Sequence, residues 1–594
     1  MRGSGERTAL VSCARMRSSA HGPEVLPAGA RFRVWAPKAG RVAVRCGGND
    51  HPLAPAGAGW HEGEVAAAGD GTRYAIVLDG ERVRPDPASR RQPDGVHGAS
   101  ELFDPSRHRW SDRGWRGIAR EDLVFYELHV GAFTEAGTLA AAAERLPELV
   151  ELGVTCVELM PVQPFAGERN WGYDGVAPYA VHEAYGGPAA LQRFVDRAHA
   201  LGLAVCLDVV YNHLGPEGNY LPELAPWFTS RHRSPWGDGL DYDGPDSGPV
   251  RAFMIGAAVQ WVRDFHVDAL RLDATHAIED ASPRHLVGAL RDAVLEAGRA
   301  ADRRVHVVAE DDRNERRVLD PPPQGWGASA VWADDLHHAL HTLLTGESAS
   351  FLQDYGRPEH VERALAHGFV YQGERSAYRG RPHGTDPRGL PPSAFVTCLQ
   401  NHDQVGNRPH GERLSSLVPW PALFPASALV LLGSGLPLLF MGEEYGEPRP
   451  FLYFTSHADP ALAKAVSEGR KGELIARGAG EIPDPQAPET FGRSKLSHRR
   501  DGRHGALRAH YRRLLAVRRR HRAAITARWP EVRRDGTAFT LLRAGLVVRA
   551  NLGASPAGGL GPWGLVVEER ADERAADAGD PPDARSRGRD GLAP

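Results

Sequence analysis

The stretch ALRLDATHAI, residues 269–278, is a short apolar segment that runs directly into charged residues. Its apolar residues predict a β-strand, on which Arg271 and Asp273, two positions apart, point to the same side. A neighbouring cation lowers the pKa of an aspartate by about 1 to 3 units, and the resulting carboxylate suits a nucleophile better than a proton donor. A structural ion pair would leave the same pattern, so the rest of the chain has to distinguish the two interpretations.

Apolar segments of this kind recur between residues 123 and 444, and helix-like stretches separate them. One such stretch, GPAALQRFVDRAHALGL at 187–203, has its apolar residues on one helical face. Strands that alternate with helices pair in parallel, and a nearly continuous apolar strand is what burial on both sides requires. The pattern therefore predicts an α/β fold, a closed (β/α)8 TIM barrel, with strands that begin near Val124, Val154, Ala204, Asp268, Val305, Ala330, Ala394 and Leu436.

Polar and ionisable residues gather where each predicted strand ends. In barrel enzymes this rim carries the catalytic groups, because the loops that follow the strands meet there. Two long loops, 215–248 and 355–392, would lie over the rim and shape a binding cleft. The rim residues are Glu127, His129, Glu158, Asp208, Asn212, His213, Arg271, Asp273, Glu310, Asp334, Asp335, His402, Asp403, Glu443 and Glu444.

Segments on either side of the barrel predict smaller domains. RFRVWAPKAGRVAVR, at 31–45, alternates polar and apolar residues around a Pro-Lys-Ala-Gly turn, which indicates a β-hairpin. A basic helix at 510–525 precedes a few more strand patterns. We predict a flexible tail at 1–25, an N-terminal immunoglobulin-like β-sandwich similar to carbohydrate-binding modules at 26–110, the catalytic barrel at 111–500, a small C-terminal β domain with a leading helix at 501–570, and a disordered tail at 571–594.

The composition argues against several classes of protein. The chain has 594 residues, with 71 Lys plus Arg against 75 Asp plus Glu, so no overall positive field would attract nucleic acid or an anionic membrane. The basic helix is interpreted as a solvated face. The 5 cysteines are scattered without a CxxC pair, which favours neither a zinc cluster nor a disulfide framework. Without a secretory signal or a membrane-spanning run, we expect a cytoplasmic protein. We expect no metal and no cofactor, and the oligomeric state stays open.

Three carboxylates, Asp273, Glu310 and Asp403, each end a different predicted strand and have polar neighbours. Hydrolysis of a glycosidic bond passes through an oxocarbenium-like state and needs one ionised and one protonated carboxyl group. Arg271 would keep Asp273 ionised as the nucleophile, whereas the apolar run before Glu310 would raise its pKa toward that of a proton donor. Asp403 would bind sugar hydroxyls and stabilise the developing cation.

Four motifs resemble the signature regions of the α-amylase family of glycoside hydrolases: DVVYNH at 208–213, RLDATH at 271–276, AED at 309–311 and NHD at 401–403. Within that family, the chain is similar to the malto-oligosyltrehalose trehalohydrolases. The features that carry this finer resemblance are ELMPVQPFAGERNWGYDGVAPYAV at 158–181, DDLHHALH at 334–341 and NHDQVGNR at 401–408. The resemblance extends from about residue 31 to beyond residue 551. One departure is Ala269, where many relatives have glycine, and it leaves the charged pattern intact.

The resemblance implies hydrolysis, with retention of configuration, of the α-1,4 bond next to the terminal trehalose unit of maltooligosyltrehalose. Trehalose and a maltooligosaccharide would be released, with α-1,4-glucans as related ligands and malto-oligosyltrehalose synthase as the pathway partner in trehalose biosynthesis. Asp273 would be the nucleophile, Glu310 the proton donor and Asp403 the transition-state stabiliser. Tyr173 would either stack on a sugar or serve packing, and Asp208 and Asn212 would hold neighbouring loops. The expected substrate-binding residues are Arg271, His276, His213, Tyr173, Asp335, His338, His402, Gln404 and Asn407.

Three alternatives differ in what they require. A glycogen branching or debranching enzyme of the same family shares the sandwich, the barrel and the three carboxylates, so only substrate-binding residues separate it from the main hypothesis. A noncatalytic sugar-binding protein on a degenerate barrel is disfavoured because all three carboxylates are present. A metal hydrolase is disfavoured because the 27 histidines include no HExxH spacing.

Overall fold

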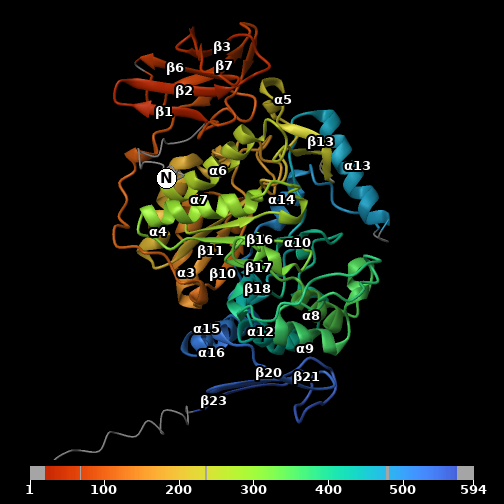
Figure 1. Cartoon of the computed structure of the whole chain (residues 1–594). Helices are drawn as coiled ribbons and strands as arrows, with labels where there is room; N and C mark the ends of the chain where they lie inside the picture. The colour runs from red at the N-terminus through yellow and green to blue at the C-terminus, as the bar shows by residue number, and fades with distance from the viewer. Residues whose placement is uncertain (1–20, 67, 235–236, 477–479, 571–594) are drawn as a thin grey trace, which may run out of the picture.

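The computed structural model describes residues 21–66, 68–234, 237–476 and 480–570. A barrel occupies the centre of the molecule, with the N-terminal sheets at one end and the C-terminal sheet at the other (Figure 1). The predicted disordered tail at 571–594 lies outside the described residues, as does the predicted flexible tail apart from its last five positions, 21–25.

The eight predicted barrel strands are all present and form a closed parallel barrel in chain order, with the last strand paired to the first. The predicted α/β fold is therefore confirmed. Each strand is buried along most of its length, which explains the nearly continuous apolar runs in the sequence. The strands are β10 (Phe125–Leu128), β11 (Cys156–Leu159), β12 (Ala204–Val209), β15 (Ala269–Leu272), β16 (His306–Glu310), β17 (Ala330–Trp332), β18 (Phe395–Cys398) and β19 (Leu436–Phe440).

The barrel interior is sorted into layers by the pleat of the strands. Ala269 lies in an apolar layer with Cys156 and Cys206, and two positions along its strand Arg271 lies in a charged layer with Asp208. Because alternate residues on a strand share one side, a further step of two places the next side chain at the rim. The barrel cysteines, Cys156, Cys206 and Cys398, are buried free thiols.

Helices surround the barrel and connect its strands, and their apolar faces pack against it. The predicted helix at 187–203 is α4, which buries its apolar face against β12. The helices up to the end of the barrel are α1 (Val130–Phe133), α2 (Leu139–Ala143), α3 (Leu146–Leu152), α4 (Gly187–Ala200), α5 (Leu221–Leu224), α6 (Ser247–Asp264), α7 (Leu286–Ala300), α8 (Asp335–Thr345), α9 (Pro358–His367), α10 (His402–Gly406), α11 (Leu414–Leu417) and α12 (Leu423–Leu431). The long loop after β12 carries α5 and a hairpin of β13 (Phe228–Ser234) and β14 (Gly237–Leu240).

The N-terminal domain consists of two antiparallel sheets, and its first strand begins inside the segment predicted as a tail. One sheet has the order β1 (Gly22–Leu26), β2 (Gly29–Trp35), β6 (Trp60–Ala66) and β5 (Ala54–Pro55). The other has β4 (Asn49–Pro52), β3 (Val42–Cys46), β7 (Arg73–Leu78) and β8 (Arg82–Arg84), with β9 (Ser100–Glu101) on β7.

The hairpin predicted at 31–45 is wrong. Its two strands, β2 and β3, belong to different sheets, and β2 pairs instead with β1 and β6. The connection 36–41 is longer than the two-residue turns that join hairpin strands most tightly, and it carries the chain from one sheet to the other. The alternating pattern is correct for each strand taken alone, because each has one face against the core between the sheets.

The C-terminal part contains helices that pack on the barrel and a four-stranded antiparallel sheet. The predicted basic helix corresponds to α15 and α16, and α15 buries Leu507, Tyr511 and Leu514 while most of its arginines are exposed or half-buried. The elements are α13 (Pro460–Ala476), α14 (Pro488–Ser494), α15 (Gly502–Arg520), α16 (Arg522–Ala527), β20 (Glu531–Asp535), β21 (Ala538–Arg543), β22 (Leu546–Asn551) and β23 (Leu565–Glu569). Throughout the described part of the chain, every helix is too short or too polar to cross a membrane.

Candidate active site

Arg271 is the centre of the site at the carboxyl end of the barrel strands. Its side chain is fully buried, and its guanidinium contacts carboxylates from three other positions of the wall. Nη1 donates to both oxygens of Asp208 at 2.9 Å and to Oδ1 of Asp273 at 2.9 Å, and Nη2 donates to Oε2 of Glu310 at 2.7 Å. The predicted pairing of Arg271 with Asp273 is present, but the same cation also binds the predicted proton donor. One planar guanidinium therefore sets the positions of the carboxylates of Asp208, Asp273 and Glu310.

The pKa values of Asp273 and Glu310 are nevertheless shifted in opposite directions. Burial acts to raise the pKa of Asp273, but Arg271, His213 and Asn212 outweigh it and hold that pKa below its usual range. Burial raises the pKa of Glu310 well above its usual range, and the negative charges of Asp273 and Asp403 raise it further against the opposing effect of Arg271. The surroundings thus favour the ionised form of Asp273 and the protonated form of Glu310, which is the division of roles that acid-assisted glycoside cleavage requires.

The backbone after β15 holds Glu310 from the other side. Ala274 has a φ of 39°, an unusual value for a residue with a side chain, and its N–H donates to Oε2 of Glu310 at 2.8 Å. Thr275 Oγ1 donates to the carbonyl oxygen of Glu310 at 2.7 Å. Backbone strain of this kind persists where surrounding contacts fix the conformation, and here those contacts orient the predicted proton donor.

Asn212 contacts the carboxylate of Asp273 directly, and Asp208 is linked to the same carboxylate through Arg271. Nδ2 of Asn212 donates to Oδ2 of Asp273 at 2.7 Å and to the backbone oxygen of Asp273 at 2.8 Å. His213 is hydrogen-bonded to the Asn212 side chain and, through Nε2, to the carbonyl oxygen of Tyr173 at 2.9 Å. The end of β12 therefore orients the second oxygen of the predicted nucleophile.

Asp403 lies in the first turn of α10 and is the most open of the three carboxylates, with 43% of its side chain exposed. Asn407, one turn later, donates from Nδ2 to Oδ1 of Asp403 at 3.0 Å, and Arg470 donates to the Asn407 side chain at 3.0 Å. A carboxylate that is held on one side and open on the other can accept a hydrogen bond from a ligand hydroxyl. Asn407, one of the predicted substrate-binding residues, therefore orients the side chain of Asp403.

His402, which follows β18, joins the site to β10 through Glu127. The two oxygens of Glu127 accept the backbone N–H of His402 at 2.9 Å and its Nδ1 at 2.5 Å. On the other side of the ring, Nε2 lies 2.8 Å from Oη of Tyr173, which donates to Oδ2 of Asp208 at 2.7 Å. The Tyr173 ring also stacks on the His402 ring. Tyr173 is therefore fixed at the site by polar contacts with Asp208 and His402. Its contact with a sugar stays a prediction.

The sixth strand contributes two adjacent aspartates that face different ways. The carboxylate of Asp335 accepts hydrogen bonds from Asn314, Tyr355 and the backbone N–H of Val370, so both of its oxygens are occupied within the protein. Burial and the charges of Asp403 and Asp335 together raise the pKa of Asp334 to about 7. Substrate contact by Asp335 stays a prediction with little support from this geometry.

The remaining predicted substrate-binding residues occupy the rim at varying depth. His338, on the first turn of α8, packs against the rings of Phe351 and Tyr355. His276 lies 3.6 Å from Asp312 and is half-buried. Gln404 is half-buried next to Asp403. Their contact with a ligand stays a prediction.

Two residues with a place in the site received no role from the sequence. Glu127 and Asp334 both end predicted strands, and that position was their only signal. Asp334 is the first residue of an Asp-Asp pair, and the pair alone does not reveal which member faces the cleft. Nowhere in the described ranges do three or more His, Cys, Asp or Glu residues gather as a metal site would require.

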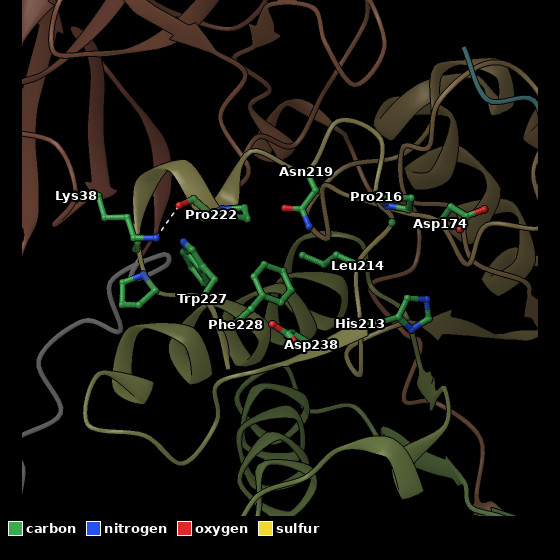
Figure 2. Close-up of a pocket in the computed structure, with 13 residues that line it drawn as sticks. Lys38, Asp174, His213, Leu214, Pro216, Asn219, Pro222, Trp227, Phe228 and Asp238 are labelled. Atoms are coloured by element: carbon green, nitrogen blue, oxygen red, sulfur yellow. Dashed lines mark hydrogen bonds between the residues drawn. The ribbon is translucent and has the colours of Figure 1, made fainter. Parts of the chain in front are cut away.

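A pocket of about 610 Å³ adjoins the site at His213 (Figure 2). It extends along the loop after β12 to Lys38 of the N-terminal domain. Its volume lies within the range of about 300–1,000 Å³ that is typical of small-molecule sites. The catalytic rim is thus continuous with a cavity that the N-terminal domain helps to enclose.

Comparisons with known proteins agree with this geometry. The family model described as "Alpha amylase, catalytic domain" matches residues 103–234. A malto-oligosyltrehalose trehalohydrolase from Rhizobium sp. (strain M-11) is 46% identical over 506 residues, which cover 82% of this chain and 84% of that protein. The crystal structure of a putative alpha amylase from Salmonella typhimurium has a TM-score of 0.87 and 41% identity, covering 93% of this chain and 99% of that one.

A relative from the alternative class matches less of the chain. A 1,4-alpha-glucan branching enzyme from Ralstonia nicotianae is 35% identical over 283 residues, which cover 42% of this chain and 36% of that protein. The similarity to branching enzymes therefore stops well short of the full length, whereas the similarity to the trehalohydrolase extends over most of both chains.

Proposed function

The chain belongs to the malto-oligosyltrehalose trehalohydrolases of the α-amylase family, and on that basis we propose that it cleaves the α-1,4 bond next to the terminal trehalose unit of a maltooligosyltrehalose. The products are trehalose and a shortened maltooligosaccharide. The observation that carries this proposal is the Arg271 fork, which holds Asp273 and Glu310 while the pKa of the first is lowered and that of the second is raised.

The reaction takes place in two steps with net retention of configuration. Glu310 donates its proton to the glycosidic oxygen as that bond breaks, and Oδ of Asp273 forms a bond to the anomeric carbon. Trehalose leaves with the proton. Glu310, now a carboxylate, takes a proton from a water molecule whose oxygen attacks the anomeric carbon and displaces Asp273.

The other residues support charge and position in these steps. Asp403 faces the open side of the site and stabilises the positive charge that develops on the sugar ring. The fork geometry supports retention, because two carboxyl groups bound to one guanidinium lie close together, and retaining enzymes have the shorter separation of the two stereochemical classes.

The substrate implies a supplying reaction, in which an enzyme converts the reducing end of a maltooligosaccharide into a trehalose unit. We assign this step to malto-oligosyltrehalose synthase. We place both reactions in the cytoplasm, where buried free thiols such as Cys156, Cys206 and Cys398 stay reduced.

The test is release of free trehalose. Purified protein is incubated separately with a maltooligosyltrehalose and with a branched glucan, and trehalose, linear maltooligosaccharides and new branch points are quantified. Trehalose from the first substrate, with the hydrolysed end formed in the α configuration by NMR, is the expected result. Formation of branches or debranching without any trehalose would overturn the proposal in favour of the branching or debranching alternative.

A further inference from the structure

The pocket beside His213 has three walls of separate origin. The loop after β11 supplies Asp174, the loop after β12 supplies most of the lining, and the connection between β2 and β3 supplies Lys38 (Figure 2). His213 belongs to both this pocket and the catalytic rim, since its ring is bonded to the Asn212 side chain that holds Asp273. The cavity therefore starts one side chain away from the predicted nucleophile.

The N-terminal domain is docked firmly where it closes this pocket. Lys38 donates from its backbone N–H to the carbonyl oxygen of Leu224 at 3.1 Å and from Nζ to that of Pro222 at 2.8 Å. Nearby, Arg84 pairs with Glu223 at 3.0 Å. These contacts tie the sandwich to α5, so the wall formed by Lys38 keeps a fixed distance from the barrel loops.

The lining combines flat apolar surfaces with a buried donor. Trp227 packs edge-on against the rings of Trp35 and Phe253, and Phe228 follows it at the cavity wall with Pro222 nearby. Nε1 of Trp227 is buried and has no hydrogen-bond partner among the residues that the structure describes. A buried N–H without a partner destabilises the protein, and a ligand oxygen at the pocket would satisfy it.

The charged groups of the pocket are already engaged. Lys38 is bonded to Pro222, Asp174 accepts from Asn170 at 2.6 Å, and Asp238 lies 3.4 Å from Arg233. The side-chain amide of Asn219 accepts the Leu221 N–H through its oxygen at 3.3 Å, which leaves its NH2 group for a ligand. A neutral ligand with apolar ring faces and many hydroxyls fits this lining better than an anion does.

We propose that this pocket binds glucosyl units of the substrate chain that lie remote from the cleaved bond, and that the N-terminal sandwich thereby helps set the preferred chain length. The inference rests on the proposed function, because it assumes an α-glucan chain at the catalytic rim. Phe228 would pack against a sugar face, while Asn219 and the Trp227 indole would donate to hydroxyls.

The test compares two substrates that differ only in chain length, glucosyltrehalose and maltopentaosyltrehalose. The variants are Phe228→Ala and Asn219→Ala, with Asn49→Ala on the exposed strand β4 as the matched control for the amide. Loss of one aromatic–sugar contact predicts a decrease in kcat/KM of about 3- to 10-fold for the long substrate. The short substrate should be cleaved at the wild-type rate by every variant.

Each outcome separates the pocket from the catalytic proposal. Equal kcat/KM for the long substrate in wild type and both pocket variants, or an equal loss on both substrates, would overturn the pocket proposal and leave the hydrolytic function standing. Failure of the wild type to release trehalose from either substrate would instead overturn the proposed function. As a second measurement, maltoheptaose binding is determined calorimetrically in Glu310→Gln and in Glu310→Gln/Phe228→Ala. Weaker binding in the double variant supports the pocket, and unchanged binding contradicts it.

Discussion

Replacement of Glu127 by glutamine would test how the barrel wall sets the charge of His402. The Tyr173 hydroxyl donates its hydrogen bond to Asp208. The contact between Tyr173 Oη and His402 Nε2 therefore requires a proton on Nε2. The contact of Nδ1 with the Glu127 carboxylate requires a second proton. The hydrogen bonds alone therefore call for an imidazolium, with Arg271 and Asp403 as the other close charges.

The size of the effect follows from the pKa of His402. Burial alone would lower this pKa, but Glu127 and Asp403 raise it to about 9. At pH 8 about 90% of such a group is protonated, whereas a group with the ordinary pKa of about 6.5 is about 3% protonated. Without the Glu127 charge, the Glu127→Gln variant should lose about 30-fold in kcat/KM at pH 8 and far less at pH 5.5.

The same shift predicts a dependence of stability on pH. A raised pKa stabilises the folded state fully below the unfolded value of about 6.5, and the contribution disappears as the pH rises through about 9. The rise in the pKa of His402 from 6.5 to about 9 corresponds to about 3 kcal/mol, and removal of one partner of a buried ion pair costs about 3–5 kcal/mol. The Glu127→Gln variant should therefore unfold more easily than wild type at pH 6, with the difference narrowing above pH 9.

The assay is kcat/KM for trehalose release between pH 5 and pH 9, with the free energy of unfolding measured at about pH 6 and about pH 10, below and above the pKa of His402. Glu158→Gln is the matched control, because burial and the charges of Glu127 and Asp208 raise the pKa of Glu158 well above its usual range. Burial and these charges favour the neutral form of Glu158, so its amide variant should keep the wild-type pH profile. A uniform loss across the whole pH range in Glu127→Gln, or the same distortion in Glu158→Gln, would refute the reasoning.

The remaining predictions concern the catalytic groups and the sixth strand. Asp273→Asn and Glu310→Gln should each lower kcat by about 10⁴- to 10⁶-fold with nearly unchanged thermal unfolding, and normal turnover in either variant would contradict its assignment. Arg271→Lys should lower kcat/KM by about 10²-fold, because an ammonium group cannot bridge Asp273 and Glu310 as the planar fork does, and wild-type kinetics would show that the bridge is dispensable. Asp335→Asn should lower the free energy of unfolding by about 1–3 kcal/mol, because Asp335 accepts protein hydrogen bonds, while Asp334→Asn should affect kcat/KM and not stability. The reverse pattern would restore the predicted substrate role of Asp335.

Much of the fold and part of the site can be read from the sequence alone, because the relevant signals are local. Each barrel strand is an apolar run with polar residues at or just beyond its carboxyl end, and both features are visible within about ten residues. The neighbourhood of Arg271 and Asp273 follows from the two-residue period of a strand. Asp273, Glu310 and Asp403 could likewise be singled out from the few residues around each of them.

Contacts between distant segments required the tertiary structure. The alternating pattern at 31–45 is the same whether its strands pair with each other or with different sheets, and only the packing of the sandwich separated β2 from β3. Asp335 accepts hydrogen bonds from residues of other segments, whereas the pKa of its neighbour Asp334 is raised by burial and by the charge of Asp403. Glu127 and His402 are 275 residues apart, and closure of the barrel brings them into contact.

The segment 269–278 illustrates both sides of this division. By itself the sequence determined that Arg271 lies beside Asp273, since alternation along one strand is a property of the backbone. Only the tertiary structure decided that the same guanidinium also binds Asp208, 63 residues earlier, and Glu310, 39 residues later. The physical reason is that a closed barrel turns the ends of separate strands toward one axis, where a single buried cation has to neutralise several carboxylates at once.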